Sequence, residues 1–191
     1  MTAANKPIGR DRDMFAARRR ALMRRMKKAR LDGVVVTRPA DMFYLTGYEG
    51  DDGAVLIGAG WTCLAASPLY GEHAHRDCLG VEVRVGRLWP GIAAALKGRG
   101  VRRLGAQDEH LTVRAWHRLE AVIGSRKLMP ANGLVGQCRL VKDDREVRMI
   151  SRAVRAAEEG FKVLFRRGKR AFVGRTERQV AAELDYQMAL A

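Results

Sequence analysis

The sequence is short of the features that mark secreted and membrane proteins. Its three cysteines, Cys63, Cys78 and Cys138, are odd in number, far apart and without a Cys-x-x-Cys pair, so they suggest neither a disulfide framework nor a zinc knuckle. No window approaches the roughly 18 uncharged apolar residues that a transmembrane helix needs. The first 13 residues, MTAANKPIGRDRD, lack the apolar core of a signal peptide. We therefore expect a soluble cytoplasmic protein that does not enter a membrane.

Acidic and aromatic residues are also scarce. Lys and Arg number 36 against 21 Asp and Glu, which gives a net charge of +15, while aromatic residues make up 6% of the chain. The basic excess lies toward the two ends, and the segment 1–32 contains one aromatic residue, Phe15. A nucleic-acid-binding surface commonly combines basic and aromatic side chains. We therefore expect no nucleic-acid binding beyond weak, non-specific electrostatic attraction.

The first two thirds of the chain carry an alternating pattern of strands and helices. An amphipathic helix at 11–31 precedes a buried strand at 34–36, and two apolar runs at 54–57 and 62–66 read as a hairpin. Further segments follow in the order helix, strand, helix, strand, helix, at 69–78, 81–85, 91–98, 102–106 and 112–124. This order predicts an α/β fold, and the hairpin predicts a mixed β-sheet flanked by helices.

The last 50 or so residues change to a purely helical pattern. Apolar residues recur at helical spacing in the following series: Val147, Ile150, Val154, Ala157, Phe161 and Leu164. Asp143 with Glu146, and Thr176 with Gln179, have the spacing of capping boxes, which predicts helices at 144–168 and 176–190. We therefore expect a flexible N-terminus at 1–13, an α/β domain at 14–136 and a separate helical segment at 137–191.

No set of side chains in the sequence forms a complete catalytic or metal-binding constellation. Glu72, His73, His75 and Asp77 have metal-ligand chemistry, but residues two apart on a helix point to different faces, and the HExxH spacing is absent. A solvated helix face is the better interpretation. Cys78 lies near His75 without a third group to orient a base. We therefore assign no catalytic residue and no metal ligand.

Two motifs in the helical segment resemble those of the Xaa-Pro aminopeptidase, prolidase and creatinase family. In RLVKDDREV, the matching residues of an R-x-x-K-x-x-x-E-hydrophobic signature are Arg139, Lys142, Glu146 and Val147. In VGRTERQVAAEL, the matching residues of a G-x-[TR]-E-x-x-hydrophobic-A motif are Gly174, Thr176, Glu177, Val180 and Ala181. YLTG at 44–47 is similar to the family's amino-terminal domain, whereas SPLYGEHA at 67–74 departs from the family's D-x-R-Y at Ser67, Pro68 and Leu69.

The resemblance implies a creatinase/prolidase-like N-terminal domain, followed by a truncated helical start of a pita-bread α+β catalytic domain. Family members hold two divalent metals, usually Mn, Co or Zn, through two Asp, one His and two Glu, all downstream of the second motif. The expected function is therefore that of a non-catalytic N-terminal portion of such a peptidase, with no cofactor in this chain. The alternative is a stand-alone binding or dimerisation module with a basic surface that docks a partner or a polyanion.

The resemblance also indicates partners. In the family, the N-terminal domain helps to form the dimer and lends loops to a neighbouring active site. The loop at 48–52 is the candidate for that contact, through Tyr48, Glu49, Asp51 and Asp52. We expect self-association, or association with the missing catalytic half.

Overall fold

The computed structural model describes residues 9–78 and 80–191. The described residues divide into two compact units, one that ends at Leu140 and one from Val141 to Ala191. The sequence predicted a flexible segment at 1–13. Its first eight residues lie outside the described part of the chain, and Gly9 to Asp13 belong to the first helix, α1. The first unit ends later than the expected residue 136 because Cys138 is buried in its core.

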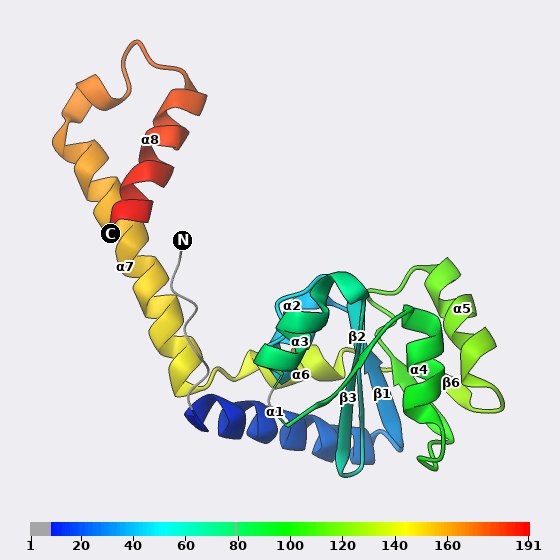
Figure 1. The fold of residues 1–191 in the computed structure, drawn as a ribbon. Helices are drawn as coiled ribbons and strands as arrows, with labels where there is room; N and C mark the ends of the chain where they lie inside the picture. Colours follow the sequence, from blue (N-terminus) through cyan, green and yellow to red (C-terminus); the bar gives the residue numbers. More distant parts are fainter. Residues whose placement is uncertain (1–8, 79) are drawn as a thin grey trace. The chain divides into compact units, whose positions relative to one another are not determined.

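The first unit contains a mixed β-sheet (Figure 1), as the sequence predicted. Within the described residues its six strands are β1 Gly33–Val36, β2 Gly53–Gly58, β3 Trp61–Ala66, β4 Glu82–Val85, β5 Arg103–Ala106 and β6 Lys127–Pro130. They lie in the order β4-β3-β2-β1-β5-β6. The hairpin strands β2 and β3 are antiparallel, as are β1 and β2, whereas β1–β5, β3–β4 and β5–β6 are parallel pairs.

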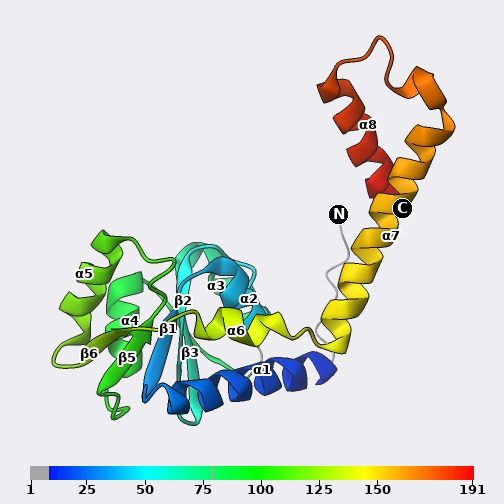
Figure 2. The ribbon, with the colours of Figure 1, turned by 180° about the vertical axis from the view of Figure 1, so that it is seen from behind.

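Helices cover both faces of this sheet. Those of the first unit are α1 Gly9–Lys28, α2 Pro39–Thr46, α3 Gly71–Asp77, α4 Leu88–Leu96, α5 Val113–Ile123 and α6 Leu134–Leu140, with a short 3-10 turn, η1, at Pro68–Tyr70. One apolar cluster joins the sheet to α1, α2, α3 and α6, and a second joins the opposite face to α4 and α5. The view from behind shows α6 running beside α1 (Figure 2).

The central strands are apolar on both faces because both faces are covered. Along β1, Val34 and Val36 enter the first cluster and Val35 enters the second, as the two-residue repeat of a strand requires. The strands β2 and β3 alternate in the same way. Such near-continuous apolar runs are therefore recognisable as buried strands in the sequence.

The second unit is helical. It consists of α7 Asp144–Arg166, a 3-10 turn η2 at Gly168–Ala171, and α8 Glu177–Leu190. Both predicted capping boxes are present, formed by Asp143 with Glu146 and by Thr176 with Gln179. The two helices pack closely at Gly160, where an added Cβ would lie 2.8 Å from Met188 Cγ. The absence of a side chain at Gly160 therefore sets the approach of α8 to α7.

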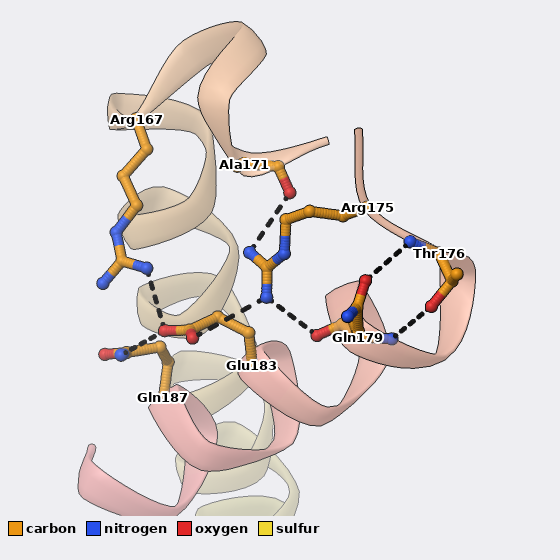
Figure 3. A network of polar contacts seen from close by, with 7 residues as sticks. All are labelled: Arg167, Ala171, Arg175, Thr176, Gln179, Glu183 and Gln187. Atoms are coloured by element: carbon orange, nitrogen blue, oxygen red, sulfur yellow. Dashed lines mark hydrogen bonds and ion pairs between the residues drawn. The ribbon is translucent and has the colours of Figure 1, made fainter. Parts of the chain in front are cut away.

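A polar network joins the C-terminal end of α7 and the turn that follows it to α8 (Figure 3). Arg167 Nη1 donates to Glu183 Oε1 at 3.0 Å, and Gln187 Nε2 donates to the same oxygen at 2.9 Å. Arg175 donates to the carbonyl oxygens of Ala171 and Gln179. Arg175 therefore joins η2 to the first turn of α8, next to the capping box formed by Thr176 and Gln179.

No helix in the described part of the chain is both long enough and apolar enough to cross a membrane.

Candidate functional site

The loop singled out in the sequence has a buried residue at its start. Tyr48 is 0% exposed, and its hydroxyl donates a hydrogen bond to the Asp52 carbonyl oxygen at 3.0 Å. Burial raises the pKa of Tyr48 to about 12. The ring closes over Gly50, where an added Cβ would lie 2.3 Å from it. Tyr48 therefore shapes the loop from inside and is not a surface contact.

The other three residues of the loop present carboxylates to solvent. Glu49, Asp51 and Asp52 are all exposed. A hydrogen bond to Asp51 raises the pKa of the Tyr70 hydroxyl, and the Tyr70 ring meets Tyr48 edge-on with centroids 6.2 Å apart. Two tyrosines thus hold the loop, Tyr48 through the Asp52 carbonyl oxygen and Tyr70 through Asp51. The loop after α2 is therefore an acidic protrusion whose three carboxylates are exposed.

A buried polar cluster that the sequence did not reveal lies at the end of the first unit. Asp41 is 1% exposed, and Arg139 Nη1 donates to its Oδ1 at 2.7 Å while Gln107 Nε2 donates to its Oδ2 at 2.7 Å. Gln107 Oε1 accepts from the backbone N–H groups of Thr37 and Arg38 at 2.8 and 2.9 Å. The cluster therefore ties α6 to the start of α2 and to the segment after β5. Arg139 is also the first residue of the R-x-x-K motif.

The arginines of α1 are not all solvent-facing, although the helix is amphipathic. Arg18 and Arg19 are 8% and 6% exposed. They donate to the carbonyl oxygens of Tyr44 and Leu45 at 3.1 and 2.8 Å, which are among the last carbonyls of α2. The Arg18 guanidinium also lies 4.3 Å from the centre of the Tyr44 ring. These two arginines join α1 to α2.

The other chemically suggestive residues form no site in the part of the chain that the structure describes. Glu72, His73 and His75 are exposed on α3, as the sequence indicated. Burial raises the pKa of the Cys78 thiol to about 12, which is opposite to the shift of an activated nucleophile. Among the described residues, no three or more His, Cys, Asp or Glu side chains are grouped so that they could hold a metal ion.

Several residues of the two family-like motifs begin helices. Glu146 Oε2 accepts from the Asp143 N–H at 3.0 Å, and Asp143 Oδ1 accepts from the Glu146 N–H at 2.9 Å. In the second motif, Gly174 has φ 77°, a left-handed conformation that favours glycine, and Thr176 caps α8. These motif residues therefore determine where α7 and α8 start, which gives them a structural role in this chain.

One side of α7 is apolar and exposed. We define the α7 apolar face as the following residues: Val147, Ile150, Val154, Phe161 and Phe165. They are between 44% and 63% exposed. At 100° per residue, Arg148, Arg155, Lys162 and Arg166 lie beside this face together with the acidic Asp144 and Glu158, and α8 packs on the other side through Gly160. The apolar face is therefore bordered by charged side chains on one side and by α8 on the other.

The comparisons with known proteins agree on one family. A family model described as the creatinase/prolidase N-terminal domain matches residues 18–141. An uncharacterized peptidase of Bacillus subtilis is 27% identical over 160 residues, which is 83% of this chain and 44% of that protein.

Solved structures have the same fold. An Xaa-Pro dipeptidase from Bacillus anthracis superposes with a TM-score of 0.84 at 24% identity, over 92% of this chain and 49% of that one. The N-terminal domain of a cytoplasmic peptidase from Mycobacterium tuberculosis superposes with a TM-score of 0.61 at 27% identity, over 64% of this chain and 98% of that one. The chain thus spans about half the length of the full-length relatives that it matches.

Proposed function

The chain belongs to the creatinase/prolidase N-terminal domain family, and from this premise we propose that it is the non-catalytic amino-terminal portion of a metal-dependent Xaa-Pro peptidase. The similar proteins support this proposal because they are an Xaa-Pro dipeptidase and other peptidases. The catalytic part, in this proposal, corresponds to the half of those relatives that this chain does not match. It supplies the two divalent metals and the residues that hold them.

The observation that carries the proposal is the α7 apolar face. Five apolar side chains, each between 44% and 63% exposed, run along one side of a single helix. Soluble monomers rarely leave contiguous apolar patches larger than about 300 to 600 Å². In our proposal the partner that covers this face is the catalytic part of the peptidase.

We further propose that the acidic protrusion formed by Glu49, Asp51 and Asp52 contacts a neighbouring protomer. Its exposure supports this role, since Tyr48 and Tyr70 hold the loop in one conformation and leave the three carboxylates free of the core. A cytoplasmic location is proposed as well, on the basis of the cytoplasmic peptidase whose N-terminal domain has the same fold.

The test is an activity and metal-binding measurement on purified residues 1–191. Hydrolysis of an Xaa-Pro dipeptide in this family needs a metal-activated water, so we expect neither hydrolysis nor stoichiometric Mn²⁺, Co²⁺ or Zn²⁺. The full-length Xaa-Pro dipeptidase from Bacillus anthracis is the positive control under the same conditions. About two metals per chain together with Xaa-Pro cleavage that survives purification would show that these residues are catalytic.

A second candidate function is docking of a polyanion, which the exposed basic residues of α1 favour. Arg20, Arg24, Lys27 and Lys28 are all solvent-exposed. Binding of this kind is electrostatic, so affinity for duplex DNA is expected to fall steeply with salt and to show no sequence preference. Binding of duplex DNA at physiological salt that is equally tight for unrelated sequences would favour this candidate over the peptidase portion.

A further inference from the structure

A pocket lies in the first unit where the C-terminal half of α1 passes the turn between β2 and β3. Its volume is about 670 Å³, and it is partly open to solvent. Three apolar side chains, Met26, Leu31 and Trp61, contribute to its wall, and three basic ones, Arg24, Lys27 and Arg99, lie around it. Small-molecule sites commonly have about 300 to 1,000 Å³, a mostly apolar lining and a few placed polar groups. This pocket has all three properties.

The apolar wall is rigid. Met26 and Leu31 are 2% and 8% exposed and belong to the apolar cluster beneath α1. The Trp61 ring lies against Gly58, where an added Cβ would be 2.4 Å from it, and the Arg99 guanidinium lies 4.2 Å from the ring centre on the indole. Arg99 is also paired with Glu82. Trp61 and Arg99 therefore keep their positions before any ligand arrives, which lowers the entropic cost of binding.

The charge around the pocket is positive. Lys27 is exposed, and its ammonium group makes no hydrogen bond or ion pair with the residues that the structure describes. Arg24 is exposed one helical turn earlier. The one acidic lining residue, Asp32, accepts from the backbone N–H groups of Arg102 and Arg103 at 2.9 and 2.8 Å, so its charge is already compensated by fixed donors. An anion near the apolar wall would therefore meet the unpaired ammonium group of Lys27, while Arg99 would be shared with Glu82.

We propose that this pocket binds a small amphipathic anion, with an apolar body against Met26, Leu31 and Trp61 and a carboxylate or phosphate group held by Lys27 and Arg99. The apolar wall and the basic rim are needed together. An uncharged hydrocarbon would leave the rim unused, and a bare anion would make no use of the Trp61 ring, which is only partly buried. The site is independent of any peptidase activity, because it uses none of the motif residues of α7 and α8.

The experiment measures binding of matched probes to the full chain by two-dimensional NMR of the indole N–H groups, with Trp61 assigned through Trp61→Phe. The probes are 2-naphthoate, 2-naphthyl phosphate, 2-naphthol and inorganic phosphate. We expect 2-naphthoate or 2-naphthyl phosphate to shift the Trp61 signal and to bind about tenfold or more tightly than 2-naphthol and inorganic phosphate, because only they use both the rim and the wall. Which of these two probes has the higher affinity shows whether the site prefers a carboxylate or a phosphate head group.

Variants test the assignment of residues. Lys27→Gln and Arg99→Gln are each expected to lower the affinity for the anionic probe about tenfold, since each removes one charge-assisted contact. Arg114→Gln, at an exposed position on α5, is the matched control and is expected to leave the affinity unchanged. Lys27 has no partner among the described residues, so Lys27→Gln is not expected to disturb the fold. Its effect on probe affinity can therefore be interpreted even if Arg99→Gln disturbs the local structure.

Three results would overturn the proposal. One is equal affinity for 2-naphthol, which would mean that the pocket selects apolar bodies without regard to charge. Another is binding of inorganic phosphate or a DNA duplex as tightly as the naphthyl probes, which would indicate a general polyanion surface. The third is no movement of the Trp61 signal at about 1 mM of either anionic probe, which corresponds to less than about 4 kcal/mol of binding.

Discussion

At the scale of single residues, the buried Asp41 carboxylate depends on its neighbours for stability. It is 1% exposed and is held by Arg139 and Gln107. In Arg139→Met the charge loses its cationic partner while it stays buried, which is strongly unfavourable. We expect a loss of about 2 kcal/mol in the free energy of unfolding of the first unit, below the value for fully buried pairs because the Arg139 side chain is 38% exposed.

Urea unfolding followed by tryptophan fluorescence measures this loss cleanly. All three tryptophans, Trp61, Trp89 and Trp116, lie in the first unit, so the signal reports on that unit alone. Arg114→Met is the control, because an exposed position is expected to change stability by no more than about 0.5 kcal/mol. If the two variants had the same stability, the cluster around Asp41 would not contribute to holding α6 on the domain.

Asp32 provides a pH-dependent prediction. Hydrogen bonds from the backbone N–H groups of Arg103 and Arg102 lower the pKa of its carboxyl group. A carboxyl group with a lowered folded-state pKa stabilises the fold above its unfolded-state pKa, near 3.9, and this contribution disappears as the pH falls through the folded-state value. Asp32→Asn keeps an acceptor oxygen but removes the charge. It is therefore expected to be less stable than the parent chain near pH 7, by under about 1 kcal/mol because the carboxylate is screened by solvent.

Thermal unfolding at about pH 7, 5 and 3 tests this expectation. The difference in midpoint between the two chains is expected to be constant between the upper two pH values and to shrink at the lowest. A difference that stays the same at all three would mean that the charge of Asp32 has no role and that only its hydrogen-bond geometry matters.

Individual side chains were also where sequence reasoning reached its limit. Tyr48 lies in a polar loop sequence and so read as a surface contact, yet its ring is buried beneath Gly50. Arg18 and Arg19 belong to an amphipathic helix rich in basic residues, yet they are held by carbonyl oxygens of α2 that only the folded chain brings within reach. The Asp41, Gln107 and Arg139 cluster joins positions far apart in the chain. No local spacing could have predicted it.

At the scale of elements, the packing of α8 on α7 depends on Gly160. An added Cβ there would lie 2.8 Å from Met188 Cγ and 3.2 Å from Leu184 Cδ1. Gly160→Val is therefore expected to displace α8, even though valine has a slightly better intrinsic helix propensity than glycine. The expected result is faster amide hydrogen exchange throughout α8, with no change in the tryptophan-detected unfolding of the first unit.

Ala153→Val, at an exposed position of the same helix, is the matched control. It introduces the same β-branched side chain with no neighbour to displace, so exchange in α8 is expected to stay as in the parent chain. Equal exchange in the two variants would indicate that α8 does not rely on close contact at Gly160.

The elements that the sequence predicted well are those with a strong local signal. The hairpin of β2 and β3 has two apolar runs around glycines, and α7 and α8 each begin with a capping box. Three elements were not predicted. The strand β6 is four residues long and ends in Pro130, and α6 has seven residues, so neither is long enough to show a period. For α2, the signals were present as Pro39 at its start and Gly47 with φ 81° at its end.

At the scale of the whole molecule, the two units differ in how their apolar residues are covered. The sheet of the first unit is enclosed by helices on both faces, with two apolar clusters of buried residues. In the second unit α8 contains no buried residue, and the α7 apolar face is about half exposed. Isolated helices gain little stability without tertiary packing. The second unit is therefore expected to be the less stable part of this chain.

Amide hydrogen exchange of purified residues 1–191, measured together with the oligomeric state, tests most directly the claim that the second unit is built to be completed by a partner. Exchange reports the free energy of local opening, and a unit with a half-exposed apolar face opens easily. We predict markedly faster exchange in α7 and α8 than in β1, β2 and β3 when the chain is monomeric, or protection of the α7 apolar face that disappears on dilution. A monomer whose α7 and α8 are as protected as β1 would contradict the account, since its second unit would then be stable without a partner.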